Sequence, residues 1–258
     1  MKIQIQLLLV ISLLLSVQVV SAAQEYRVSS PSHRVAVLEL YTSEGCSSCP
    51  PADAWLSKLK HTNVAVTDIV PLAFHVTYWD YIGWRDRYAD SRYDDRQREI
   101  GRFNSSRTIY TPQFVLNGAD YRRHSRFDSD LDNIGAQKAL VDIELSAIEK
   151  TSTQLDVELV ANIARSPVKD VALYLAVYEN NLASDVSAGE NEGETLKHDF
   201  VVRKLYGPFI QRQPQNRQRY MQTLEFGDDW KRMDLNLAVF AQNPHTGEVL
   251  QAVRLELK

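Results

Sequence analysis

The chain has 258 residues, of which 44% are hydrophobic and 24% charged, and its formal net charge is −4. This composition excludes a disordered, collagen-like or disulfide-dense protein, and the absence of excess positive charge argues against nucleic acid as a partner. A chain of this length forms one or two domains whose cores need no cross-links. Its two cysteines, Cys46 and Cys49, therefore point to chemistry rather than to stability.

Residues 1–23 have the pattern of a secretory signal peptide. Lys2 precedes an apolar run from Leu7 to Leu15, and the segment ends on the small residues Ala22 and Ala23. Because Gln4, Gln6 and Gln18 interrupt the segment and no basic cluster follows it, we expect cleavage near Ala22 or Ala23 rather than a membrane anchor. The sequence thus predicts a periplasmic or secreted protein that is not membrane-anchored after cleavage and that can hold a disulfide.

Residues 34–140 alternate between strand and helix patterns, as in an α/β domain. Strands are expected at residues 35–41, 69–76 and 113–116, and helices at 50–59, 88–103 and 129–140. Pro50 and Pro51 suit a first helical turn, and Asn117-Gly118 predicts a hairpin. The insertion before the third strand is rich in aromatic residues and arginine, and its helix is expected to be solvent-exposed and held by ion pairs.

Residues 141–258 change to a period of two, which indicates β-strands. Apolar residues alternate along 155–163 and 171–177, and two further strands at 235–241 and 249–257 flank a hairpin turn. Strands of this length separated by turn residues are typical of an antiparallel sandwich. The predicted fold class is therefore an α/β domain followed by an all-β antiparallel sandwich domain.

The motif Cys46-Ser47-Ser48-Cys49 lies between the first strand and a helix. A helix N-terminus offers unpaired N–H groups and a positive dipole end, which favour the thiolate form of Cys46. Cys46 would then attack a disulfide and Cys49 would resolve the mixed disulfide. A structural disulfide remains an alternative. A haem site would need a histidine after the second cysteine, and Pro50 occupies that position.

A second motif, Thr111-Pro112, starts the strand at 113–116. X-Pro bonds are where cis peptides occur, and such a proline beside a dithiol can present an open backbone to an extended substrate. Together with the order of elements, this resembles the thioredoxin fold. The resemblance implies that Glu39, in the first strand, is a buried acid that moves protons for the resolving thiol.

Several longer segments are similar to the DUF1223 family of exported thioredoxin-like proteins. They are residues 38–53, residues 74–84, Arg96-Gln97, residues 110–113 and residues 188–198. The family implies the fold but no settled activity, and it implies aspartate where this chain has Thr77. The glycine-containing loop at 189–193 is expected to connect two strands and to pack on the first domain.

These patterns predict a thiol–disulfide oxidoreductase that acts on protein or small-molecule thiols and disulfides. Its catalytic residues would be Cys46, Cys49 and Glu39, without any cofactor beyond the redox-active disulfide. The substrate would contact Thr111, Pro112, His75, Tyr78 and Trp79. Two alternatives stay open: copper or zinc binding by the CxxC motif with His75, and a binding module whose disulfide is structural.

Overall fold

The computed structural model describes residues 24–61, 68–163, 168–212 and 217–258. The expected signal peptide lies outside these residues. The helices are α1 (Pro50–Lys58), α2 (Ser91–Phe103) and α3 (Phe127–Gly135), with 3₁₀ turns at Leu59–His61, Thr77–Ile82, His124–Arg126 and Arg232–Asp234. The strands of the first half are β1 (Glu25–Ser29), β2 (Ala36–Thr42), β3 (Ile69–His75), β4 (Gln113–Leu116) and β5 (Ala119–Asp120).

The second half contributes only strands and one short turn to the described structure. These strands are β6 (Asp142–Thr151), β7 (Gln154–Asn162), β8 (Asp170–Glu179), β9 (Leu182–Asp185), β10 (Thr195–His198), β11 (Val201–Arg212), β12 (Arg217–Glu225), β13 (Leu235–Gln242) and β14 (Val249–Glu256). The structure is therefore mostly β-sheet.

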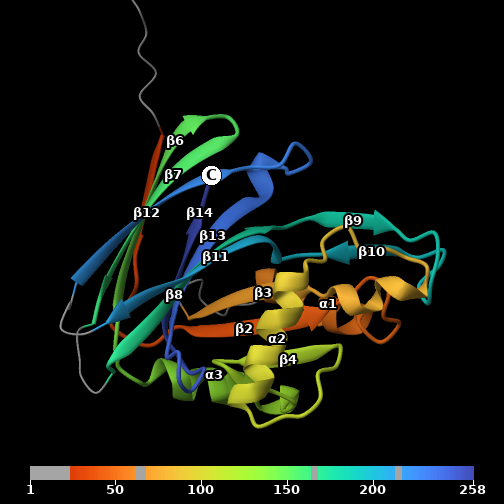
Figure 1. The fold of residues 1–258 in the computed structure, drawn as a ribbon, viewed down its shortest axis with the longest axis horizontal. Coiled ribbons are helices and arrows are strands. Elements are labelled where there is room, and N and C mark those ends of the chain that lie inside the picture. Colours follow the sequence, from red (N-terminus) through yellow and green to blue (C-terminus); the bar gives the residue numbers. More distant parts are fainter. Residues whose placement is uncertain (1–23, 62–67, 164–167, 213–216) are drawn as a thin grey trace, which may run out of the picture.

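One eight-stranded sheet runs through both halves of the chain, in the order β14-β13-β8-β11-β3-β2-β4-β5 (Figure 1). Strands β2 and β3 are parallel, and β4 is antiparallel to β2. The join between the halves is narrow, because β11 pairs with β3 through Val201 and Ala73. A second sheet, β1-β6-β7-β12, forms a separate antiparallel layer.

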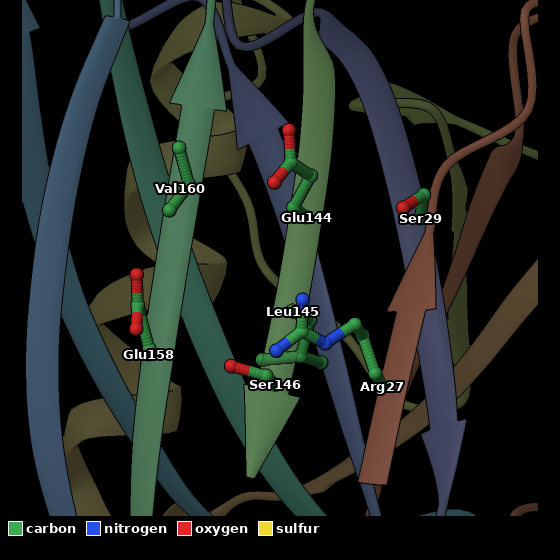
Figure 2. Close-up of a pocket in the computed structure, with 7 residues that line it drawn as sticks. All are labelled: Arg27, Ser29, Glu144, Leu145, Ser146, Glu158 and Val160. Atoms are coloured by element: carbon green, nitrogen blue, oxygen red, sulfur yellow. The ribbon is translucent and has the colours of Figure 1, made fainter.

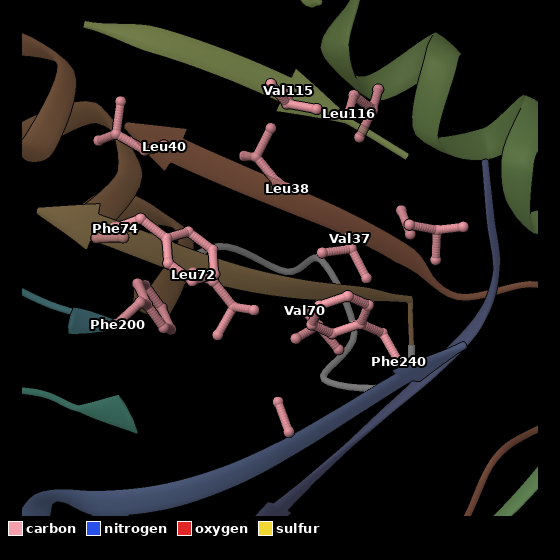
Figure 3. Packing of buried hydrophobic residues seen from close by; sticks show 14 of the residues in the cluster. Val37, Leu38, Leu40, Val70, Leu72, Phe74, Val115, Leu116, Phe200 and Phe240 are labelled. Atoms are coloured by element: carbon pink, nitrogen blue, oxygen red, sulfur yellow. The ribbon is translucent and has the colours of Figure 1, made fainter. Parts of the chain in front are cut away.

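Two hydrophobic cores lie on opposite faces of the eight-stranded sheet. Along β8, Leu173 and Leu175 belong to the core shared with the four-stranded sheet, whereas Tyr174 and Ala176 belong to the core of the first half. This follows from the pleat of a strand, which points successive side chains to opposite faces. Figure 3 shows part of the first core, where β2, β3 and β4 contribute valine, leucine and phenylalanine side chains.

Helices cover both faces of the sheet around β2. Trp55 of α1 packs edge-on against Phe114 of β4 and Phe127 of α3, so α1 and α3 share one face. The neighbouring residue Gln113 points the other way and accepts a hydrogen bond from Gln97 of α2. The end of β2 is therefore enclosed from both sides.

Most expected elements are confirmed, with shifted ends that have local causes. Helix α2 begins at Ser91 because Asp90 caps it, accepting a hydrogen bond from the Arg92 N–H at 2.9 Å. Helix α3 ends at Gly135 because the following residues pair with the lead segment, for example Arg34 N–H to Gln137 C=O at 2.9 Å. Strand β1 was not expected, since as an outer strand it buries only Tyr26.

The expected ion pairs of the arginine-rich helix are present, as between Arg92 and Asp90 and between Arg98 and Asp95, but the helix is not solvent-exposed all round. One face of α2 is buried, and it includes Tyr93, Asp94, Arg96, Gln97 and Ile100. Among the described residues, no helix is long and apolar enough to span a membrane.

Candidate functional site

Cys46 and Cys49 form a disulfide where β2 ends and α1 begins. Their Cα atoms lie 5.4 Å apart. Cys49 is the N-cap residue of α1, and its carbonyl accepts hydrogen bonds from the Ala52 and Asp53 N–H groups. The Ser48 hydroxyl lies 3.3 Å from Cys46 Sγ. After reduction this hydroxyl can donate to a thiolate at Cys46.

The disulfide is fully buried, with both cysteines 0% exposed. The loop between β9 and β10, residues 186–194, reaches this part of the chain. The Asn191 amide donates to the carbonyls of Glu44 (2.7 Å) and Cys46 (3.1 Å), and the Glu190 carboxylate accepts from the Ser47 N–H at 2.9 Å. The predicted packing of this loop on the first half is thus confirmed. We call residues 186–194 the covering loop.

Trp79 links Thr111 and Pro112 to the CxxC segment. The Trp79 indole N–H donates to Thr111 Oγ1 at 2.6 Å, and a Cβ atom added to Gly45 would lie 3.2 Å from Trp79 Cβ. The Thr111–Pro112 peptide is cis. Trp79 therefore lies between the CxxC loop and the start of β4.

Tyr78 contacts α2. Its hydroxyl donates to Gln97 Oε1 at 3.0 Å, and burial raises the pKa of Tyr78 to about 12. The neighbouring Thr77, through its backbone N–H and hydroxyl, donates to the Asp94 carboxylate at 2.8 and 2.6 Å. Residues 77 and 78 thus fix the loop to α2.

Glu39 is buried as expected, but both of its oxygens are occupied. Arg96 donates two hydrogen bonds to it, at 2.7 and 2.8 Å, and the Tyr41 hydroxyl donates a third at 2.8 Å. Burial opposes the charge of Arg96, yet the Glu39 carboxylate outweighs this and raises the pKa of Arg96. No hydrogen bond joins Glu39 to either cysteine within the described residues, so its proton-transfer role stays a prediction. The acid one helical turn after Cys49 is Asp53.

His75, at the end of β3, belongs to a buried cluster that includes residues distant in sequence. Its Nδ1 lies 2.6 Å from Asp86 Oδ2. Its ring packs edge-on against that of His198 from β10, with centroids 5.0 Å apart. Asp53 of α1 completes a group whose three ligand atoms lie within 4.8 Å of one another. Among the described residues, this is where metal-ligating atoms converge, and neither cysteine belongs to the group.

The electrostatics of this cluster are dominated by carboxylates. His198 lies between Glu44 Oε1 (3.3 Å from Nε2) and Asp53 Oδ1 (3.8 Å from Nδ1). Burial opposes a charge on His198, but the two carboxylates outweigh it and raise its pKa to about 10. Asp86 is also buried, which opposes its charge, yet His75 and two backbone N–H donors lower its pKa.

The sequence contained these residues without identifying their role. Asp53 and His198 both fall within the segments that resemble the family, but they are 145 residues apart in the chain, and no spacing rule links them. Only the pairing of β9 with β10 and the approach of this hairpin to α1 bring them together.

A hollow lies on the outer face of the four-stranded sheet (Figure 2). It is lined by Arg27, Ser29, Glu144, Leu145, Ser146, Glu158 and Val160. Its charged groups already have partners, since Glu144 pairs with Arg217 and Glu158 with Arg219. The four-stranded sheet that carries it also lies away from α1 (Figure 1).

Comparisons with known proteins agree with this architecture. HBP35 of Porphyromonas gingivalis superposes with a TM-score of 0.66 at 13% identity, over 87% of this chain and 76% of that chain. A structural genomics target from Agrobacterium tumefaciens superposes with a TM-score of 0.63 at 24% identity, over 89% of this chain and 97% of that chain. At these identities the similarity concerns the fold alone. No curated protein matches the chain.

The family resemblance is confirmed by a family model. The family described as "Protein of unknown function (DUF1223)" matches residues 37–242. This match covers β2, the CxxC motif, the covering loop and both histidines of the buried cluster. Because it covers well over half of the chain, the protein belongs to the DUF1223 family.

Proposed function

We propose that this chain is an exported, thioredoxin-like thiol–disulfide exchange protein whose redox centre is Cys46–Cys49. The observation that carries the proposal is the position of the disulfide at the start of α1, directly after β2. The strand order β3-β2-β4-β5, with α1 after β2 and Thr111-Pro112 before β4, supports the thioredoxin-like interpretation. The apolar N-terminal segment supports export.

The exchange would proceed in two balanced steps. In the reduced protein, the Cys46 thiolate attacks one sulfur of a partner disulfide, and the other partner sulfur leaves as a thiolate. The Cys49 thiolate then attacks Cys46 Sγ, which releases the second partner sulfur and forms the Cys46–Cys49 bond. The partner gains two electrons and two protons, and the protein loses them. The reverse sequence transfers the disulfide to a dithiol partner.

The helix N-terminus and Ser48 are suited to this chemistry. The positive end of the α1 dipole and a hydroxyl 3.3 Å from Cys46 Sγ both favour the thiolate over the thiol. Since a thiolate is the nucleophile, these groups would make Cys46 the attacking sulfur. Trp79 and Thr111, joined by a hydrogen bond, would form the adjacent contact surface for the partner.

The burial of the disulfide adds a condition to the proposal. A nucleophile must approach one sulfur directly, and both sulfurs are covered in this state. Exchange therefore requires the covering loop to open. Asn191 and Glu190 would set the rate of opening, because their hydrogen bonds hold the loop on the CxxC segment.

Trapping of a mixed disulfide tests the proposal. The Cys49→Ser variant keeps the attacking sulfur but cannot resolve the intermediate. It should therefore accumulate a mixed disulfide with a model peptide that contains a disulfide. The matched Cys46→Ser variant should form far less adduct. Equal adduct from the two variants, or none from either at pH 8, would contradict the assigned roles.

A further inference from the structure

We propose that Asp53, His75 and His198 form a buried binding site for one divalent first-row metal ion, with zinc as the best match. The site is distinct from the CxxC motif and does not depend on thiol exchange. It lies at the carboxyl ends of β2 and β3, where Thr42 and His75 are paired neighbours. Ligands in α/β sheets are commonly bound outside this end of the strands.

The histidines are buried with little around their ring nitrogens except carboxylates. His75 is 0% and His198 2% exposed, and within the described residues His75 Nε2 has no hydrogen-bond partner. The His198 nitrogens face the Glu44 and Asp53 carboxylates, at 3.3 and 3.8 Å. A buried polar atom without a partner is unfavourable, and a metal ion among these side chains would bind the free His75 nitrogen.

Each of the three ligands has an orienting partner on its far side. Asp86 Oδ2 accepts from His75 Nδ1 at 2.6 Å, which directs Nε2 into the cluster. The Thr42 hydroxyl donates to Asp53 Oδ2 at 2.8 Å, which leaves Oδ1 for an ion. Carboxylate–histidine pairs of this kind fix the ring orientation in metal sites.

His198 has the same arrangement through Glu44. Its Nε2 faces Glu44 Oε1, and its Nδ1 faces Asp53, so Nδ1 is the ligand atom. Glu44 is itself fixed, because the Trp84 indole N–H donates to its other oxygen at 2.8 Å. The three ligand side chains are thus held in place before a metal ion binds, by Asp86, Thr42 and Glu44.

The charge around the cluster also favours a cation. Three buried carboxylates, those of Glu44, Asp53 and Asp86, surround the cluster, and within the described residues their ion-pair partners are histidines. No arginine or lysine of the described chain pairs with them. A divalent cation held by neutral imidazoles would balance two of these three negative charges, in place of the protons that otherwise charge the histidines.

The ligand set favours zinc or a similar ion. Two imidazoles and one carboxylate occur in catalytic zinc sites, which keep a further position for water or substrate, and also in non-haem iron sites. Metal–ligand distances of about 2.0–2.1 Å would draw together atoms that now lie within 4.8 Å of one another. The aromatic ring of Tyr88, packed on both histidines, closes one side of the site.

The test measures zinc binding to the untagged, oxidised full-chain protein after chelator treatment, in competition with a chromophoric chelator. Because the disulfide is intact, neither cysteine offers a thiolate. We expect one tightly held ion per chain and X-ray absorption from nitrogen and oxygen ligands near 2.0 Å. No retained ion in the wild-type protein, or sulfur ligands near 2.3 Å, would overturn the proposal.

Variants locate the ion. Asp53→Asn, His75→Gln and His198→Gln should each weaken zinc binding by roughly 100-fold or more, and Asp86→Asn by about 10–100-fold through misorientation of His75. The matched control is His245→Gln, since His245 is an exposed histidine that pairs with Asp170. Binding that persists in all three ligand variants, or that falls in the control, would show adventitious surface binding. If a variant fails to fold, the X-ray absorption measurement on the wild-type protein still tests which atoms bind the ion.

Discussion

The side-chain amide of Asn191 donates to the backbone carbonyl of Cys46 at 3.1 Å, across 145 residues of sequence. The same amide donates to the Glu44 carbonyl, and the residue is 7% exposed. A loop that would otherwise be a simple connection between β9 and β10 is thereby fixed onto the CxxC segment. The reactivity of the disulfide should depend on this contact.

Loosening the covering loop should expose the disulfide. Asn191→Ala removes two hydrogen bonds, worth together about 1–2 kcal/mol, so reduction of Cys46–Cys49 by a phosphine should accelerate roughly tenfold through local opening. The matched control is Glu192→Gln, an exposed residue of the same loop. Equal reduction rates for wild type and Asn191→Ala would mean that this loop does not limit access.

The Glu39–Arg96 pair should be a stability element. Glu39→Met leaves the Arg96 charge buried among Tyr174 and Phe240 without its carboxylate, which should lower the free energy of unfolding by about 3–5 kcal/mol. The double variant Glu39→Met/Arg96→Met should recover most of this loss. Urea unfolding measures both.

The same residue can be tested for proton transfer. Glu39→Gln keeps the shape of the side chain, so any effect on exchange can be compared with its effect on stability. The predicted proton-relay role requires the exchange rate to fall by more than the folded fraction does. An exchange rate that changes only in proportion to the folded fraction would contradict that role.

Two glycines should respond to alanine in opposite directions. Gly118 has φ +86°, and a Cβ atom there would lie 1.9 Å from the Gly247 carbonyl oxygen, so Gly118→Ala should destabilise the protein by more than about 1 kcal/mol. Gly135 in α3 has no atom within 4 Å of the added Cβ, and Gly135→Ala should stabilise it by about 0.4–1 kcal/mol. Denaturation midpoints that shift in the same direction would contradict this reading of the turn.

The cap of α2 predicts a pH effect. A hydrogen bond from the Arg92 side chain, together with the backbone bond, lowers the pKa of Asp90 below 3.8. A depressed folded-state pKa contributes stability above the unfolded value, and this contribution is lost as the pH falls through the folded value. Asp90→Ala should therefore cost about 1 kcal/mol near pH 7 and progressively less below pH 4. A difference that is independent of pH would show that the charge is not involved.

Local patterns in the sequence predicted most of the individual elements. The strand at Gln113–Leu116, the hairpin at Asn117-Gly118 and the proline-led helix α1 were found because each depends on neighbouring residues. The continuous eight-stranded sheet could not be predicted in this way. It depends on the pairing of Val201 with Ala73, which periodicity does not encode.

Only part of the candidate site could be predicted from the sequence. The CxxC motif and Thr111-Pro112 carry short sequence signals, whereas the cluster of Asp53, His75 and His198 comes from three separate elements. The alternation along β8 was recognised, but its intervening residues Tyr174 and Tyr178 are also buried. A sheet buried on both faces gives a weaker periodic signal, so the relation between the two halves was not visible.

The reduction potential of the Cys46–Cys49 disulfide tests the proposed function most directly. The wild-type protein would be equilibrated in glutathione buffers, with the reduced fraction measured by alkylation. Our account predicts a potential above about −300 mV, in the range of exchange-active disulfides. A potential below about −300 mV, as in structural disulfides, would contradict it.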